Sequence, residues 1–306
     1  MSSPVVAAID LGSTSVKTLV TGADGALAQI TRVTRLGSGV DRTGRLDPAA
    51  IERTLAALTE FRLAADVHGA GAVRAVATSA CRDAANRDEF FDAAEQILGV
   101  RPVLLSGEDE GRLAYRGALG SLGVLAPPVA VVDIGGGSTE IMVGDAELRA
   151  VRSIDLGAGR VTERELHHDP PRPEELTNAI GLVQDHVDDL LRELPELGEV
   201  TTVVGLGGTV KVAAAVELGL PEFDPRLVHG FHFRREAVED VFRTLATESL
   251  ADRVHNPGLP ADRAEVIVGG CCVLVAVLRR LRVPELIVSA CGVLDAVAQQ
   301  LLEEKR

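Results

Sequence analysis

Asp10-Leu11-Gly12-Ser13-Thr14-Ser15-Val16-Lys17 and Asp133-Ile134-Gly135-Gly136-Gly137-Ser138-Thr139-Glu140 are two copies of one pattern within a chain of 306 residues. Aligning the copies pairs Asp10 with Asp133 and Lys17 with Glu140, and an apolar run precedes each copy, at residues 5–9 and 129–132. An internal repeat of this kind indicates two related half-molecules.

Each copy predicts a strand, a tight turn and a second strand, because β-branched residues flank a short Gly/Ser turn that has no helical periodicity. Glycines let consecutive N–H groups approach an anion, and the hydroxyls add further donors. One such loop is equally compatible with an ordinary hairpin, whereas two in register favour phosphate binding. The predicted phosphate-binding residues of the loops are Gly12, Ser13, Thr14, Ser15, Gly135, Gly136, Gly137 and Ser138.

The carboxylates of the two loops predict a metal site. A carboxylate at the end of a strand would repel phosphate directly, so Asp10 and Asp133 are expected to bind a divalent cation or its waters. Glu140 joins them, because Mg²⁺ (or Mn²⁺) prefers few protein carboxylates together with phosphate oxygens.

The alternation of strand and helix patterns predicts an α/β fold. In the first half, strands are expected near 5–9, 16–21, 27–33, 73–77 and 102–105, with helices from 48 to about 65 and from about 86 to 98. In the second half, strands are expected near 129–133, 139–143, 148–154, 201–205 and 285–289, with helices near 158–167, 173–193, from 207, 262–281 and 292–304. This order predicts a mainly parallel sheet, covered on both faces, in each half, with the site in the crevice between them.

The composition excludes some classes of partner. A formal charge of -14 argues against nucleic acid and membrane surfaces. It also conflicts with a polyanionic substrate, but the conflict eases because arginines crowd the first half, at Arg32, Arg35, Arg42, Arg45, Arg74, Arg82, Arg87 and Arg101. A locally positive cleft on an acidic body is therefore expected.

The chain shows no signal for export. Its first residues lack a signal peptide's basic and apolar segments, and residues 266–278 are too short to cross a membrane and predict a buried core helix. The four cysteines have neither zinc-ligand spacing nor a disulfide framework, and the histidines form no ligand set. A cytoplasmic protein is expected.

Five motifs occur in the order found in one known family. They are Asp10 to Ser15, Ala77 to Arg82, Leu105 to Arg112, Val132 to Glu140, and Gly205 to Thr209. The paired loops resemble those of the acetate and sugar kinase, heat-shock 70 and actin superfamily. Within it, the five motifs resemble the exopolyphosphatase and guanosine pentaphosphate phosphohydrolase (Ppx/GppA) family, in its short two-domain form.

The resemblance implies two ribonuclease H-like (actin-like ATPase) domains with an interdomain cleft, residues 1–128 and 129–306, the last helix packing back on the first domain. It implies Glu110 as the catalytic base, although Glu108 and Asp109 are rivals by position. Lys17 and Arg82 are suited to phosphate, Arg82 because its planar fork grips two oxygens. Gly208 and Thr209, at a helix start, form a further anion site.

The resemblance also implies a hydrolase. The expected activity is an exopolyphosphatase that releases orthophosphate from the ends of short polyphosphate chains. The alternatives are hydrolysis of guanosine pentaphosphate (pppGpp) in the stringent response, a superfamily kinase, and a non-catalytic phosphate or alarmone sensor. The partners are then polyphosphate or pppGpp, with no nucleic acid or membrane, and a homodimer is allowed.

Two departures from the family pattern affect substrate preference. Thr14 stands where many members have Asn, and the stretch from Ser289 to Asp295 lacks the arginine of the family's S-x-x-G-L-R. Neither departure removes a catalytic group.

Overall fold

The computed structural model describes residues 4–305 and divides the chain into two compact units. Unit 1 runs to Leu113 and resumes at Val293, whereas unit 2 runs from Ala114 to Gly292. Each unit is built on one sheet.

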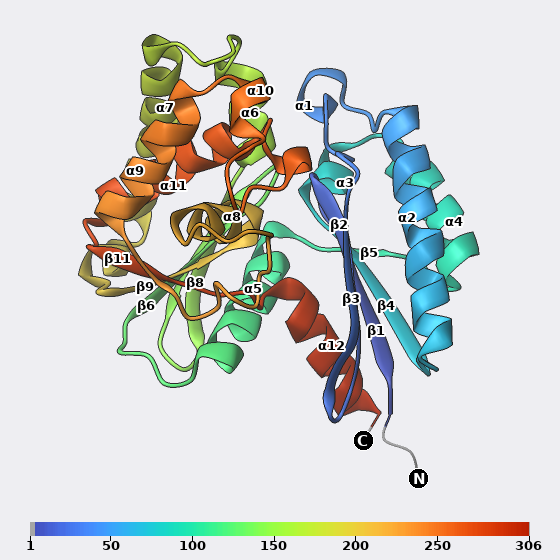
Figure 1. Ribbon diagram of the computed structural model, residues 1–306. Coiled ribbons are helices and arrows are strands. Elements are labelled where there is room, and N and C mark those ends of the chain that lie inside the picture. Colours follow the sequence, from blue (N-terminus) through green and yellow to red (C-terminus); the bar gives the residue numbers. More distant parts are fainter. Residues whose placement is uncertain (1–3, 306) are drawn as a thin grey trace. The chain divides into compact units, whose positions relative to one another are not determined.

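The sheet of unit 1 has the strand order β3-β2-β1-β4-β5 (Figure 1). Its strands are β1 (Val6–Leu11), β2 (Ser15–Gly22), β3 (Gly25–Val33), β4 (Ala72–Ala77) and β5 (Val103–Leu104). Its helices are α1 (Val40–Thr43), α2 (Pro48–Val67), α3 (Ser79–Asp83), α4 (Arg87–Leu98), the first residues of α5 (Gly107–Leu122), and α12 (Val293–Glu304).

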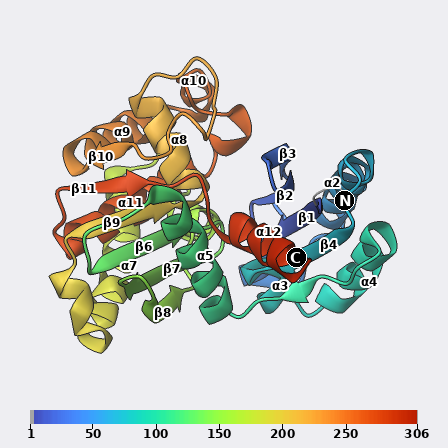
Figure 2. The ribbon, with the colours of Figure 1, turned by 90° about the horizontal axis from the view of Figure 1, so that it is seen from below.

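Helices cover both faces of this sheet. Side chains alternate along a strand, so Ile9 and Leu11 share one face and pack in a core with Phe61 of α2. Helix α12 contacts β1, β2 and β4, and Figures 1 and 2 show it on the face opposite α2. Asp47 caps the N-terminus of α2, because its side chain accepts a hydrogen bond from the Ala50 N–H at 3.0 Å.

The sheet of unit 2 repeats this scheme with one strand more, in the order β10-β11-β9-β6-β7-β8. Its strands are β6 (Val129–Ile134), β7 (Thr139–Gly144), β8 (Leu148–Ile154), β9 (Thr202–Leu206), β10 (His232–Arg234) and β11 (Glu285–Val288). Its helices are α6 (Ala158–Glu165), α7 (Pro173–Glu193), α8 (Gly207–Glu217), α9 (Arg235–Thr247), α10 (Leu250–Arg253) and α11 (Ile267–Leu281), with 3₁₀ turns at Pro195–Glu199 and Ala261–Arg263. In both units three antiparallel strands are followed by two parallel ones, which is the expected ribonuclease H-like arrangement.

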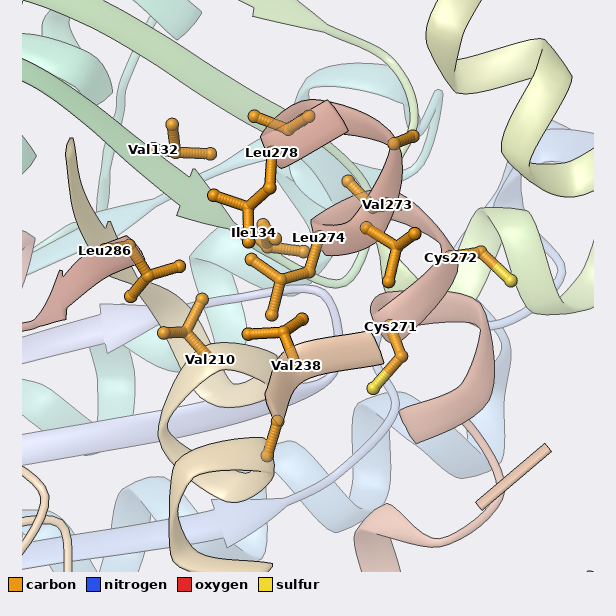
Figure 3. Close-up of a cluster of buried hydrophobic side chains, with 14 of the residues drawn as sticks. Val132, Ile134, Val210, Val238, Cys271, Cys272, Val273, Leu274, Leu278 and Leu286 are labelled. Carbon is orange, nitrogen blue, oxygen red and sulfur yellow. The ribbon is translucent and has the colours of Figure 1, made fainter. Parts of the chain in front are cut away.

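Helix α11 forms the centre of the unit 2 core. Its Leu274 and Leu278 lie in one buried cluster with Val132 and Ile134 of β6 (Figure 3). The same cluster contains Val210, Val238 and Leu286. The segment 266–278 is thus a buried core helix, as predicted. No helix within residues 4–305 is long and apolar enough to cross a membrane.

The expectation of mainly parallel sheets is wrong. In each unit the first three strands pair antiparallel, β2 with β1 and β3, and β7 with β6 and β8. The cause is the connections themselves, since strands joined by a turn of a few residues run antiparallel, whereas a parallel pair needs a long crossover.

Several elements were not anticipated. The sequence patterns did not predict α1, α3, β10, α9 or α10. Helix α11 begins at Ile267 rather than at 262, because a 3₁₀ turn follows Pro260. Helix α9 had a usable signal, since its buried residues Val238, Val241 and Leu245 follow helical spacing.

Candidate active site

The first loop connects β1 to β2 and holds a charged pair at its base. Asp10 lies directly opposite Lys17 on the neighbouring strand, so the two side chains share a face of the sheet. Lys17 Nζ lies 3.1 Å from Asp10 Oδ2, and Asp10 is 7 % exposed. Asp10 therefore already has a cation beside it.

The carbonyl groups of this loop accept hydrogen bonds from the backbone of residues 34–37. Ser13 O accepts a hydrogen bond from Gly37 N (2.8 Å), and Thr14 O accepts from Thr34 N (3.1 Å) and Arg35 N (2.9 Å). Within residues 4–305, the N–H groups of Gly12, Ser13 and Thr14 have no hydrogen-bond partner. A turn with occupied carbonyls and unused N–H groups suits an anion.

Helix α3 is attached to the same loop. Ser13 Oγ lies 2.8 Å from Ser79 Oγ and accepts from Ala80 N at 3.2 Å. These contacts place the motif that ends at Arg82 beside the first loop. Ser79 was not predicted as a site residue, although it lies inside a predicted motif.

Arg82 and Glu110 form an ion pair at the start of α5. Arg82 Nη1 donates to Glu110 Oε2 at 2.9 Å and to the Leu105 carbonyl at 3.0 Å. Glu110 is 9 % exposed. Arg82 Nε and Nη2 have no partner among the described residues, so three N–H donors remain for substrate oxygens.

The geometry separates the three acidic candidates of the α5 first turn. Glu108 is exposed and paired with Arg112, and the Asp109 carboxylate accepts from Ser106 Oγ at 2.7 Å. Of the three, Glu110 alone is buried and paired with Arg82. The structure therefore favours Glu110 as the reactive carboxylate.

Cys81, next to Arg82, is fully buried. Desolvation raises its pKa to about 12, against the lowering effects of Arg87 and Arg82. The thiol stays protonated at neutral pH, in agreement with a packing role rather than a nucleophilic one.

The second loop, between β6 and β7, repeats the design of the first. Gly135 O accepts from Ala158 N (2.9 Å), and Gly136 O accepts from Gly159 N (2.8 Å) and Arg160 N (3.3 Å). In the part of the chain that the structure describes, the N–H groups of Gly136, Gly137 and Ser138 have no hydrogen-bond partner. The start of α6 thus takes the place that residues 34–37 have behind the first loop.

The charged pair at the base of the second loop differs from that of the first. Asp133 lies opposite Glu140, at the register position of Asp10 and Lys17. Glu140 is 1 % exposed, and its Oε1 accepts from Ser153 Oγ at 2.7 Å. Two carboxylates directly opposite each other repel, and a divalent cation would relieve this repulsion.

The few carboxylates at the second loop fit a cation that keeps much of its hydration shell. No group of three or more His, Cys, Asp or Glu side chains with metal-site geometry occurs within residues 4–305. Mg²⁺ is typically held by one or two carboxylates together with waters and substrate phosphates. Asp133 and Glu140 fit this demand better than Asp10, which is paired with Lys17.

A third anion-binding element adjoins Asp133. Helix α8 starts at Gly207, whose φ of 90° lies in the left-handed region. Arg263 lies over the next residue, since its Nη1 would be 3.1 Å from a Cβ at Gly208. No hydrogen bond or ion pair of the Arg263 side chain is present within residues 4–305, and desolvation lowers its pKa against the opposing effect of Asp262.

An unpaired guanidinium at a helix N-terminus opposes the helix dipole, which favours a bound anion. The structure thus adds Arg263 to the predicted residues Gly208 and Thr209. No sequence motif contains Arg263, and only packing brings it to α8.

We expect Gly207→Ala to destabilise unit 2 and to abolish activity. A Cβ there would lie 2.2 Å from Ile134 O and 2.9 Å from Asp133 Oδ1, in a backbone conformation that L-residues avoid. The free energy of unfolding should fall by about 2–4 kcal/mol, measured by chemical denaturation. Gly181→Ala in α7, where a Cβ meets nothing within 4 Å, is the control and should not destabilise. Equal stability of the two variants would contradict this account.

Comparison with known proteins agrees with this geometry. A model of the Ppx/GppA phosphatase family matches residues 16–304. The chain belongs to this family. The resemblance in the motifs is thereby confirmed.

Two Ppx/GppA relatives differ in how much of their length the chain spans. Exopolyphosphatase 2 of Mycobacterium tuberculosis is 38% identical over 313 residues, which cover 97% of this chain and 98% of that protein. The guanosine-5'-triphosphate,3'-diphosphate pyrophosphatase of Vibrio cholerae is 30% identical over 314 residues, which cover 100% of this chain but 61% of that protein.

Solved Ppx/GppA structures share the fold over the whole chain. An exopolyphosphatase-like protein, 32% identical, superimposes with a TM-score of 0.93 and covers 99% of this chain and 100% of its own. The Aquifex aeolicus family member, also 32% identical, gives a TM-score of 0.77 and covers 99% of both chains.

Proposed function

We propose that this chain is an exopolyphosphatase that removes orthophosphate from the ends of inorganic polyphosphate with the help of Mg²⁺ or Mn²⁺. The observation that carries the proposal is the Arg82–Glu110 ion pair, at 2.9 Å, in the unit that holds the first loop. In this pair, the Glu110 carboxylate can accept a proton, and the Arg82 guanidinium has N–H donors left for phosphate oxygens. The relation to exopolyphosphatase 2 over nearly its full length supports the same substrate class.

The proposed reaction is hydrolysis of the terminal phosphoanhydride bond. A water oxygen attacks the terminal phosphorus in line, the bond to the bridging oxygen breaks, and the shortened chain leaves on that oxygen. Glu110 orients the water and accepts its proton, while loop N–H groups and Arg82 hold the phosphate oxygens. A divalent cation beside Asp133 and Glu140 would neutralise phosphate charge.

Hydrolysis of pppGpp is the second candidate. It is supported by the 30% identity to the Vibrio cholerae protein, and the same groups would perform it. Orthophosphate release should be measured from tripolyphosphate, long-chain polyphosphate and pppGpp with Mg²⁺. A higher kcat/KM on polyphosphate would support the exopolyphosphatase proposal. A higher kcat/KM on pppGpp would instead identify pppGpp as the preferred substrate. No release from any of them would contradict both.

We expect the enzyme to act distributively and to prefer short chains. Many surface arginines are already paired with carboxylates, as in Arg62–Asp66 and Arg152–Glu193, and the net charge is -14. A long chain therefore gains little binding energy along the surface and dissociates after each cut. On a gel, the length of a long-chain substrate should drift downward uniformly. Full-length chains persisting beside free phosphate would show processive action instead.

Arg82→Ala is expected to raise KM and lower kcat together, since Arg82 both faces substrate and holds Glu110. Steady-state kinetics on tripolyphosphate measure both constants. A change in KM alone would show that the contact with Glu110 has no part in turnover.

A further inference from the structure

Residues 34–46, here called the basic loop, carry an unusual charge for this chain. They follow β3, contain α1, and include three arginines (Arg35, Arg42 and Arg45) against one acidic residue, Asp41. The loop is positive in a protein whose net charge is -14.

One end of the basic loop is fixed to the first phosphate loop. Thr34, Arg35 and Gly37 donate their N–H groups to the carbonyls of Thr14 and Ser13 at 2.8–3.1 Å. The backbone packs closely there, since a Cβ at Gly37 would lie 2.8 Å from that of Ser13. The basic loop therefore borders the turn that is suited to phosphate.

The other end is fixed to the segment after α3, the helix that carries Arg82. Ala85 N donates to Gly44 O at 2.9 Å. The buried Asn86 accepts from Leu46 N at 2.8 Å and donates to Leu46 O at 3.1 Å. Two anchors hold the basic loop along one border of the predicted site within unit 1.

Arg42 and Arg45 are exposed and have no carboxylate partner among residues 4–305. Some exposed arginines elsewhere are paired, as Arg32 is with Glu60 and Arg226 with Asp224. Others, such as Arg234 and Arg282, are exposed without an ion-pair partner among residues 4–305, so the position of Arg42 and Arg45 on the basic loop is what distinguishes them. Two exposed cations, on a loop whose ends are anchored to an anion-binding turn and to the segment after α3, raise the local positive potential and attract a polyanion.

We propose that Arg42 and Arg45 bind the phosphates of a linear polyphosphate that lie beyond those held by the first loop and Arg82. This assignment rests on the proposed function and adds a determinant of chain length to it. The two guanidiniums reach only a few phosphates, so the gain in affinity is complete in chains a few phosphates longer than tripolyphosphate. It therefore remains compatible with distributive action on short chains. Because a nucleoside replaces these distal phosphates in pppGpp, the basic loop favours the inorganic chain.

The test is the double variant Arg42→Gln/Arg45→Gln. We expect KM for long-chain polyphosphate to rise about tenfold, equivalent to ~1.4 kcal/mol for the two contacts together, with kcat unchanged. KM for tripolyphosphate should change less than about twofold, and added salt should weaken long-chain binding less than in the wild type. The matched control is Arg226→Gln/Arg243→Gln, which removes the same charge from two exposed arginines of unit 2 that are paired with Asp224 and Asp240.

Three outcomes would overturn the proposal. An equal rise in KM on tripolyphosphate would place the two arginines at the terminal phosphates. An equal rise in KM in the control variant would show that the effect comes from the net charge of the protein and not from the position of Arg42 and Arg45. The third is measured by calorimetry with long-chain polyphosphate and excess chelator, where no turnover is needed. Equal affinity of wild type and double variant there would refute the assignment even if the enzyme proved to have another substrate.

Discussion

Glu110→Gln is expected to abolish turnover while leaving substrate binding nearly intact. The substitution keeps the size of the side chain and a hydrogen-bond acceptor for Arg82, but removes the oxygen basic enough to take a proton from water. The rate constant kcat should fall by about 10²–10⁴-fold, with KM changed little. Single-turnover and steady-state measurements on tripolyphosphate would establish both values.

The control lies on the same helical turn. Glu108 is exposed and paired with Arg112, so Glu108→Gln alters the charge of the turn without touching the Arg82 pair. Its kcat should remain within about threefold of the wild type, because exposed pairs contribute little. Near-normal turnover of Glu110→Gln, or an equal loss in Glu108→Gln, would remove Glu110 from the proposed role.

Loss of either carboxylate of the second loop should produce the other large effect. We expect no activity in excess chelator, rescue by Mg²⁺ or Mn²⁺, and a metal requirement raised at least about tenfold in Asp133→Asn or Glu140→Gln. The reason is the direct opposition of Asp133 and Glu140 across β6 and β7, which a cation would compensate.

Thermal unfolding supplies a readout that does not depend on turnover. Mg²⁺ should raise the Tm of the wild type and not that of Asp133→Asn, because the variant has lost a proposed ligand of the cation. Asp10→Asn is the comparison, since Asp10 is paired with Lys17 and should affect the metal requirement less. Full activity in excess chelator would refute the metal proposal.

The local elements near the predicted site were well specified by sequence. The apolar runs before Asp10 and Asp133 are strands that end at a Gly/Ser turn, and α8 starts at Gly207 as expected. These elements depend on neighbouring residues, whose alternation and turn chemistry are visible in the chain. The order of strands and helices alone does not predict the direction of pairing, because the direction depends on the length of the connections between strands.

By itself, the sequence determined the repeat: aligning the two motifs already pairs Asp10 with Asp133 and Lys17 with Glu140, and the strand registers place these residues at matching positions. Only the tertiary structure decided which acid of the α5 first turn meets Arg82, and that Arg263 lies over the start of α8. The physical reason is the range of the interactions. Strand and turn formation are governed by residues a few positions apart, whereas the partner of a charged side chain is fixed by packing between segments far apart in the chain, which no local pattern records.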